Sequence, residues 1–268
     1  MDNVWLAFGL TTLAGLSTGI GSAIGFFAKR TNTKFLSASL GFSAGVMIFV
    51  SMIEIYPKAQ TVLSAALGTR PGGWVTAAAF FAGILLIAVI DKVIPSAENP
   101  HEMHRVEELC EDGVCQTKSN LMRTGVFTAM AIAIHNFPEG IATFVSALQE
   151  PSIAIPITVA IAIHNIPEGI AVSVPIFYAT GDKKKAFLYS FLSGLSEPVG
   201  AIVAYLVLMP FLNEVVFGII FAAVAGIMVF ISLDELLPSA RAYGEPHLSI
   251  YGAILGMAVM AVSLLLFM

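Results

Sequence analysis

The segment AIAIHNFPEGIA at residues 131–142 recurs 29 residues later as AIAIHNIPEGIA at residues 160–171. Eleven of the twelve positions are identical, and the only difference is Phe137 against Ile166. Both copies lie in the middle of long apolar runs, where His, Asn, Pro and Glu are improbable in lipid. If each run spans a membrane, consecutive spans are antiparallel and the two copies are inverted relative to each other. The duplication predicts a central helix pair with polar residues at its middle.

The composition indicates a membrane protein. Of the 268 residues, 57% are hydrophobic and only 12% are charged, whereas a soluble domain has about 25% charged residues. This excludes a soluble enzyme and a disordered chain. It also excludes a nucleic-acid partner, which would require clustered Lys and Arg. The expected surroundings of the chain are therefore the lipid bilayer.

Eight apolar runs are long enough to cross a bilayer, which requires about 20 residues each. They predict an all-α, polytopic fold that forms a single transmembrane domain over residues 1–268. The predicted spans are Val4–Ala28, Phe35–Tyr56, Trp74–Ile94, Leu121–Leu148, Ser152–Tyr178, Ala186–Met209, Val215–Pro238 and Leu248–Met268.

The basic residues predict the orientation of these spans. Eleven of the thirteen Lys and Arg residues fall on one side of the predicted bundle, and only Lys58 and Arg70 fall on the other. By the positive-inside rule the Lys-rich loops are cytoplasmic, so both termini face outward. An odd number of spans would place the termini on opposite sides and spoil this segregation.

Two fainter repeats flank the duplication. Residues 45–57 resemble residues 226–238 at an offset of 181, and residues 15–21 resemble residues 194–200 at an offset of 179. Together they predict three spans, a central pair and three more spans, related by a pseudo-twofold axis in the membrane plane. Alternating-access transporters are built in this way and bind substrate at the repeat interface. For the second pair, the alternative is that apolar helices resemble one another by composition alone.

Acidic and imidazole side chains at membrane depth point to a cation. An ionisable group at the bilayer centre costs at least about 2.5–3.5 kcal/mol, so it needs a partner or a function. No Lys or Arg of the chain reaches that depth, so the carboxyl groups either stay protonated or recruit a cation from outside. The residues concerned are Glu54, His135, Glu139, His164, Glu168, Glu197, Asp234 and Glu235.

The spacing within each copy suits a metal site. Residues four apart share a helix face, so each His lies one turn from the Glu of its own copy, and the Asn between them extends the ligand arc. Imidazole with carboxylate suits zinc, whereas amide and carboxylate oxygens accept harder ions such as Mn²⁺ or Fe²⁺. Gly140 and Gly169 let the two helices approach closely. The candidate ligands are His135, Asn136, Glu139, His164, Asn165 and Glu168.

On these motifs the chain resembles the ZIP family of divalent metal transporters over essentially its whole length. The resemblance implies a homodimer in the bacterial inner membrane. It also implies import of zinc, and of iron, manganese, cobalt or cadmium, with the metal as substrate and no catalytic cofactor. It further implies a binuclear site between spans four, five and six, completed by Glu197. By this resemblance, His135, Glu139, His164 and Glu168 hold zinc, and Asn136, Glu139, Asn165, Glu168 and Glu197 form a second, oxygen-rich site.

Three acids lie apart from the central pair. Glu54 precedes Pro57 at the predicted outer end of span two, and Asp234 and Glu235 precede Pro238 at the predicted inner end of span seven. We expect them to attract ions at the entrance and exit of the path. The alternative is that they are ordinary interfacial residues.

The predicted cytoplasmic loop over residues 95–120 is rich in metal-ligating residue types. It contains His101, His104, Cys110, Cys115 and an acidic run. Such a loop either binds metal released inside or is simply a solvated acidic segment. Two cysteines without a second pair do not make a zinc finger.

Two other functions were considered beside transport. An intramembrane zinc metalloprotease typically uses His-Glu-x-x-His on a regular helix, but this chain has a proline where that pattern needs regular helix. A metal-sensing receptor would need a substantial soluble domain, which the chain lacks. The sequence therefore favours a transporter over an enzyme.

Overall fold

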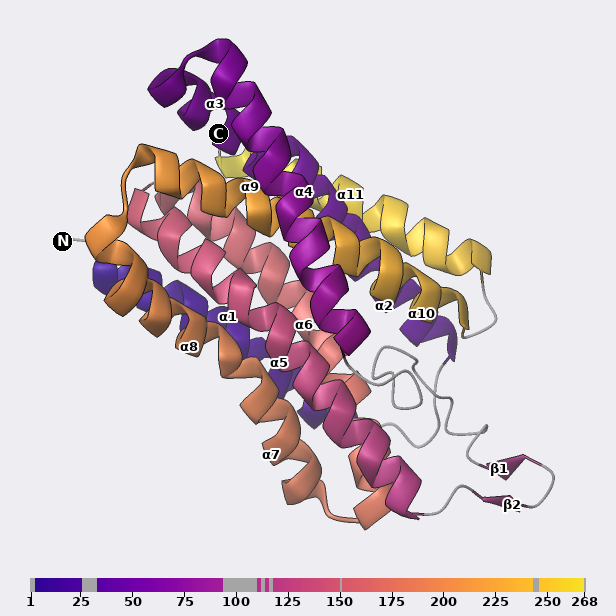
Figure 1. The fold of residues 1–268 in the computed structure, drawn as a ribbon. Helices are drawn as coiled ribbons and strands as arrows, with labels where there is room; N and C mark the ends of the chain where they lie inside the picture. Colours follow the sequence, from indigo (N-terminus) through magenta and orange to yellow (C-terminus); the bar gives the residue numbers. More distant parts are fainter. Residues whose placement is uncertain are drawn as a thin grey trace.

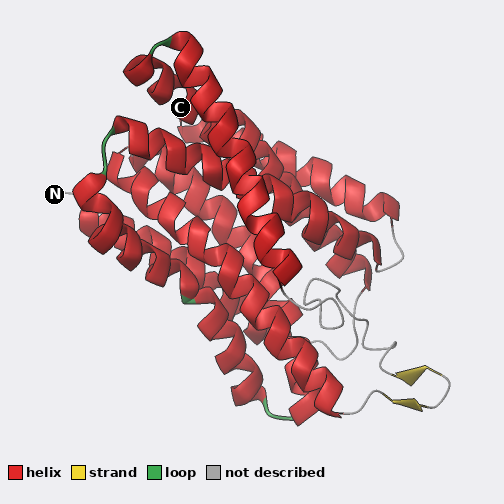
Figure 2. Cartoon of the chain, viewed as in Figure 1, coloured by secondary structure: helices red, strands yellow, loops and turns green. Residues whose placement is uncertain are grey.

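A computed structural model describes residues 3–25, 33–93, 110–111, 114–115, 118–149, 151–242 and 246–267 of the chain. These residues are almost entirely helical (Figure 2). The helices are α1 Val4–Gly25, α2 Thr33–Val50, α3 Tyr56–Leu67, α4 Thr69–Val93, α5 Lys118–Gln149, α6 Pro151–Thr180, α7 Lys183–Gly194, α8 Ser196–Val203, α9 Glu214–Ile231, α10 Leu237–Ala242 and α11 Pro246–Phe267.

Short irregular turns join some of these helices into longer rods. They are the π-turns η1 Ser51–Ile55, η4 Ala204–Leu208 and η6 Ser232–Leu236, and the 3₁₀ turn η5 Met209–Phe211. Over the described ranges the result is eight rods: α1, α2–η1–α3, α4, α5, α6, α7–α8–η4–η5, α9–η6–α10 and α11.

The rods have the length and polarity of membrane spans. Seven of them are long and apolar enough to cross a membrane: Val4–Ile24, Ser37–Leu67, Thr69–Lys92, Ala154–Thr180, Lys183–Phe211, Glu214–Arg241 and His247–Leu266. The remaining rod, α5, has 32 residues. At 1.5 Å per residue it is about 48 Å long and exceeds a hydrocarbon core of about 30 Å. The predicted all-α, polytopic membrane fold is confirmed.

The second rod is longer than the predicted span Phe35–Tyr56, because it continues past Pro57 to Leu67. A proline removes one helical hydrogen bond and clashes with the carbonyl four residues before it. Here the helix widens into η1 just before the proline, and the Tyr56 amide donates to the Ser51 carbonyl oxygen, five residues back. This wider turn lets the rod continue where a proline would otherwise end it.

The same arrangement recurs in the rod that contains α9. The π-turn η6 ends two residues before Pro238, and the Leu237 amide donates to the Ser232 carbonyl oxygen. The turns η1 and η6 begin 181 residues apart, which is the offset of the sequence repeat. A third π-turn, η4, also ends two residues before a proline, Pro210.

The rods pack into two groups (Figure 1). The first bundle consists of α1, α5, α6, α7 and α8, and the second bundle consists of α2, α3, α4, α9, α10 and α11. They meet where α6 packs against α2 and α11, and where α5 packs against α9. Each bundle takes helices from both halves of the chain, so the two bundles differ from the two predicted sequence repeats.

Glycines bring helices into backbone contact within each bundle. A Cβ added at any of them would overlap a carbonyl oxygen of a neighbouring helix: Gly15, Gly21, Gly140, Gly169, Gly194 and Gly200 in the first bundle, and Gly41, Gly45, Gly83, Gly226, Gly252 and Gly256 in the second. Small residues permit this approach in membrane proteins. Among the glycines of the described ranges, none makes such a contact from one bundle to the other.

The segment between α4 and α5 is described only at a short hairpin. Its strands, β1 Cys110–Glu111 and β2 Val114–Cys115, pair antiparallel, with Cys110 opposite Cys115. In Figure 1 this hairpin lies at the end of the molecule away from the marked chain termini. His101, His104 and the acids of residues 107–108 lie outside the described residues, as does Asp112.

Candidate functional site

The two copies of the duplicated segment lie on α5 and α6, which pack side by side in the first bundle. Both helices continue through their prolines, Pro138 and Pro167. The seven predicted ligands are each at most 3% exposed: His135, Asn136, Glu139, His164, Asn165, Glu168 and Glu197. The structure therefore brings these polar side chains together in the interior, away from the lipid-facing surface.

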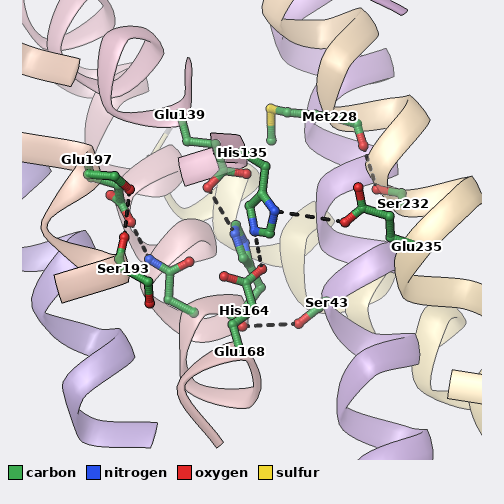
Figure 3. Close-up of polar contacts among 12 residues, drawn as sticks. Ser43, His135, Glu139, His164, Glu168, Ser193, Glu197, Met228, Ser232 and Glu235 are labelled. Carbon is green, nitrogen blue, oxygen red and sulfur yellow. Dashed lines mark hydrogen bonds and ion pairs between the residues drawn. The ribbon is translucent and has the colours of Figure 1, made fainter. Parts of the chain in front are cut away.

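Each histidine bonds to the glutamate of the other copy (Figure 3). His135 Nε2 lies 3.1 Å from Glu168 Oε1, and His164 Nε2 lies 3.2 Å from Glu139 Oε2. The sequence predicted that each His and Glu share a face of one helix, but it did not predict that the hydrogen bonds run between the helices. The exchange is reciprocal, as expected for two inverted copies of one motif.

Asn165 and Glu197 form a second contact beside these pairs. The Asn165 amide nitrogen Nδ2 donates to Glu197 Oε1 and, at 3.0 Å, to the Ala14 carbonyl oxygen of α1. Because both partners are acceptors, the amide nitrogen must face them and Oδ1 must face away. Asn165 Oδ1 and Glu197 Oε2 therefore remain as oxygen donors for another group.

Glu197 lies near the other ligands because the sixth rod breaks at Leu195, between α7 and α8. Pro198 has no N–H with which to bond the carbonyl of Gly194, four residues earlier. The new helix places Glu197 in its first turn, where a negative charge is favoured. The absence of a side chain at Gly140 lets the Glu197 backbone lie against α5.

Many donor atoms in this cluster have no hydrogen-bond partner within the described part of the chain. They are His135 Nδ1, His164 Nδ1, both polar side-chain atoms of Asn136, Asn165 Oδ1, Glu139 Oε1, Glu168 Oε2 and Glu197 Oε2. Buried polar groups are normally paired. No Lys or Arg occurs between Arg123 and Lys183, so α6 and nearly all of α5 lack a basic residue that could pair with these carboxylates.

The His–Glu pairs do not form a ready-made metal cage. Across the described ranges, no group of three or more His, Cys, Asp and Glu side chains converges closely enough to hold a metal ion. The ligand atoms that a metal would use are bonded to each other in two separate pairs. A bound ion would require these pairs to open and turn toward a common point.

The three outlying acids occupy different surroundings. Glu235, on η6, is only 7% exposed, and its Oε2 lies 3.9 Å from His135 Nδ1. It was expected at the mouth of the path, but the carboxyl group lies beside the central cluster (Figure 3). The neighbouring Asp234 is exposed, and Glu54 is half-buried in η1.

The sequence analysis missed two residues near the cluster. Ser43 of α2 donates from Oγ to the His164 carbonyl oxygen at 3.5 Å. Thr18 of α1 is fully buried, and its hydroxyl has no partner in the described structure. The signal for Thr18 was present, because the repeat of residues 15–21 aligns it with Glu197.

Comparison with known proteins identifies the family. The family model described as ZIP Zinc transporter matches residues 95–264. The chain is 65% identical to the zinc transporter ZupT of Clostridium perfringens, covering 100% of this chain and 98% of that protein. It is 67% identical to the zinc transporter ZupT of Streptococcus mutans and 66% identical to that of Oceanobacillus iheyensis, with 99% of both chains covered in each case.

The chain belongs to the ZIP zinc transporter family.

Membership in the ZIP family establishes the general activity. The chain is a multi-pass protein of the bacterial inner membrane and a transporter of divalent metal, with zinc as the substrate. ZIP proteins are transporters and not enzymes, so zinc is cargo here and not a catalytic cofactor. The expected membrane class, transport class and substrate are confirmed.

Proposed function

We propose that this chain imports zinc, together with Fe²⁺, Mn²⁺, Co²⁺ and Cd²⁺, through a binuclear site between α5, α6 and α8. The single observation that supports the site most strongly is the reciprocal pairing of two imidazoles with two carboxylates at full burial. Such groups are costly in a membrane. No basic residue near them in the sequence could compensate the carboxylates.

In this proposal the entering ion exchanges the His–Glu hydrogen bonds for coordination bonds. His135, Glu139, His164 and Glu168 present imidazole nitrogens and carboxylate oxygens, the ligands that zinc prefers. The oxygens of Asn136, Asn165 and Glu197, with Glu139 and Glu168 as bridging carboxylates, form the second site and suit harder ions such as Fe²⁺ or Mn²⁺. The absence of thiolates keeps binding weak enough for release.

Transport in this proposal comes from movement of the first bundle against the second. Glycine-mediated backbone contacts hold the helices within each bundle, and none of those described joins the bundles. The polar contacts from the site to the second bundle are few: Ser43 with the His164 carbonyl, and Glu235 with His135. Movement of one sequence repeat against the other fits less well, because each bundle mixes helices of both repeats.

The remaining parts of the proposal concern access and assembly. Glu54 and Asp234 attract ions at the two sides, and Glu235 takes the ion from His135. The transporter is one domain with both termini outside and forms a homodimer, which the molar mass of the protein purified in detergent tests. A dimer fits the exposed apolar faces no better than lipid does, so this part rests on the family resemblance alone.

The proposed site is tested by uptake of radioactive zinc into proteoliposomes. Glu139→Gln keeps the size of the side chain but removes its charge, and it takes away the partner of His164. We expect zinc uptake to fall by at least about tenfold, because a ligating carboxylate is lost. Glu168→Gln should give the same result, since the two residues are reciprocal.

The matched control is Glu214→Gln, which makes the same change at an exposed position in the first turn of α9. It should retain wild-type uptake. Wild-type zinc uptake in both Glu139→Gln and Glu168→Gln would sink the proposed site, although it would leave membership in the family untouched. No observation in the structure or among the relatives favours the metalloprotease alternative.

A further inference from the structure

The contacts around the site follow a local twofold pattern. The Glu197 carbonyl lies against Gly140 of α5, and the Thr18 carbonyl lies against Gly169 of α6. Gly140 and Gly169 are equivalent positions of the duplicated segment, 29 residues apart. Thr18 therefore stands to α6 as Glu197 stands to α5.

Other contacts repeat the pattern. Gly21 lies against the Ile166 carbonyl, and Gly200 lies against the Phe137 carbonyl, so both partners again differ by the two repeat offsets. Gly15 and Gly194 lie against each other's carbonyl oxygens. The axis that relates the two copies thus passes between α1 and α7, close to this glycine pair.

This pattern pairs every proposed ligand with a residue of its own kind except one. His135 corresponds to His164, Asn136 to Asn165 and Glu139 to Glu168 in the sequence repeat. The counterpart of Glu197 is Thr18, which is fully buried. The local twofold therefore relates a carboxylate on one side of the site to a neutral hydroxyl on the other.

The Thr18 hydroxyl departs from the other buried threonines for an identifiable reason. Thr11, Thr76 and Thr158 each donate to the carbonyl four residues earlier. For Thr18 that carbonyl belongs to Ala14, which already accepts from Asn165 Nδ2 at 3.0 Å and from Ser17 Oγ at 2.5 Å.

Asn136 shows the same deficit at the equivalent place. Asn165 makes two hydrogen bonds through Nδ2, whereas both polar side-chain atoms of Asn136 are buried and unpartnered in the described structure. The twofold pattern places Thr18 on the Asn136 side, as Glu197 is on the Asn165 side. A buried hydroxyl and a buried amide without partners are destabilising unless something else binds them.

We propose that Thr18 and Asn136 form a neutral oxygen half-site for the transported divalent cation, opposite the charged half-site of Glu197 and Asn165. This inference rests on the proposed function and adds Thr18 to its site. Neutral hydroxyl and amide oxygens bind a divalent ion, or the water that it retains, more weakly than a carboxylate does. The half-site therefore helps to hold the ion without a fourth carboxylate that would slow its release.

Zinc uptake measured over a range of zinc concentrations tests this role. Thr18→Val replaces the hydroxyl by a methyl group of similar size. We expect its KM for zinc to rise by about tenfold, whereas Thr18→Ser, which keeps the hydroxyl, stays within about twofold of wild type. The melting temperature of Thr18→Val should be equal to or above that of wild type, because an unpaired polar group is removed.

The matched control is Thr11→Val, which removes a buried hydroxyl from the same helix where that hydroxyl bonds to its own helix. Its KM should be unchanged. A wild-type KM for Thr18→Val overturns the inference. Equal losses in Thr18→Val and Thr18→Ser, accompanied by a lower melting temperature, also overturn it, because they indicate a packing role.

Thr18→Asp provides a test in the opposite direction. A carboxylate at this position should tighten equilibrium zinc binding to the purified protein by about tenfold and lower the maximal uptake rate. Weaker binding than wild type, at an unchanged elution volume, contradicts the inference. If zinc uptake does not depend on Glu139 either, the proposed function itself has failed, so the two failures are distinguishable.

Discussion

At the residue scale, the site is defined by its reciprocal His–Glu pairs. The duplicated segment allowed all seven candidate ligands to be predicted, because polar residues repeated in apolar runs have few structural explanations. Their pairing could not be predicted, because spacing along one helix says nothing about what the neighbouring helix presents. Glu235 was expected at a mouth for a related reason: the span was assumed to end near its proline.

His164 separates the two proposed metal positions. Its imidazole belongs to the zinc set, whereas the second position is built from oxygen atoms. His164→Ala should therefore lower zinc uptake at limiting zinc by about tenfold or more and affect iron uptake much less. Parallel assays with radioactive zinc and reduced iron measure both losses. The control is His247→Ala, since His247 is an exposed histidine near the start of α11.

Equal losses of zinc and iron transport in His164→Ala would contradict the two-position assignment. Loss of both metals in His247→Ala would instead indicate a general effect on folding or insertion. Asn136 and Thr18 are not part of this comparison, so its outcome is independent of the neutral half-site.

At the scale of the element, apolar length predicted the existence of the spans but not their course. Hydropathy located each rod, because a lipid-embedded backbone must satisfy its own hydrogen bonds and does so as a helix. The continuation of the second rod beyond Pro57 was not predicted, because proline usually ends a helix. The π-turn that accommodates it depends on a hydrogen bond shifted by one residue, which has no signature in the hydrophobic pattern.

Backbone contact at glycines gives a prediction at this scale. A Cβ at Gly45 of α2 would overlap the Ala253 carbonyl of α11, and nothing lies within 4 Å of a Cβ added at Gly9 of α1. Gly45→Ala should destabilise the protein by about 1–3 kcal/mol through overpacking. Gly9→Ala should be neutral or stabilising by up to about 1 kcal/mol, because alanine favours helix.

Thermal unfolding of both variants in the same detergent measures the difference. A melting temperature of Gly45→Ala equal to that of Gly9→Ala would mean that α2 and α11 are not in backbone contact in the membrane protein. Neither position is among the proposed metal ligands, so a change in uptake alone would not explain the result.

At the scale of the whole molecule, the two-bundle division was not predicted from the sequence. The repeats suggested that each half of the chain moves as a unit, but packing assigns helices of both halves to each bundle. Contacts between distant spans depend on three-dimensional fit among many similar apolar faces, and no local pattern encodes that fit. The distribution of Lys and Arg, in contrast, predicts how the whole bundle sits in the membrane.

The predicted orientation can be measured with single cysteines. Arg70, next to the α3–α4 turn, and Lys184, at the start of α7, are both exposed and fall on opposite sides in the predicted topology. In a background with Cys110 and Cys115 replaced by serine, Arg70→Cys should react with a membrane-impermeant maleimide in intact cells. Lys184→Cys should react only after permeabilisation. The reverse pattern would invert the topology.

The matched π-turns also bear on the history of the proposed repeat. A π-turn arises when one residue is added to an α-helix, and η1 and η6 stand at corresponding places before Pro57 and Pro238. Two independent insertions at the same place are improbable. The insertion therefore predates the duplication, and the ancestral three-span unit already carried both the extra residue and its proline before it became half of a transporter.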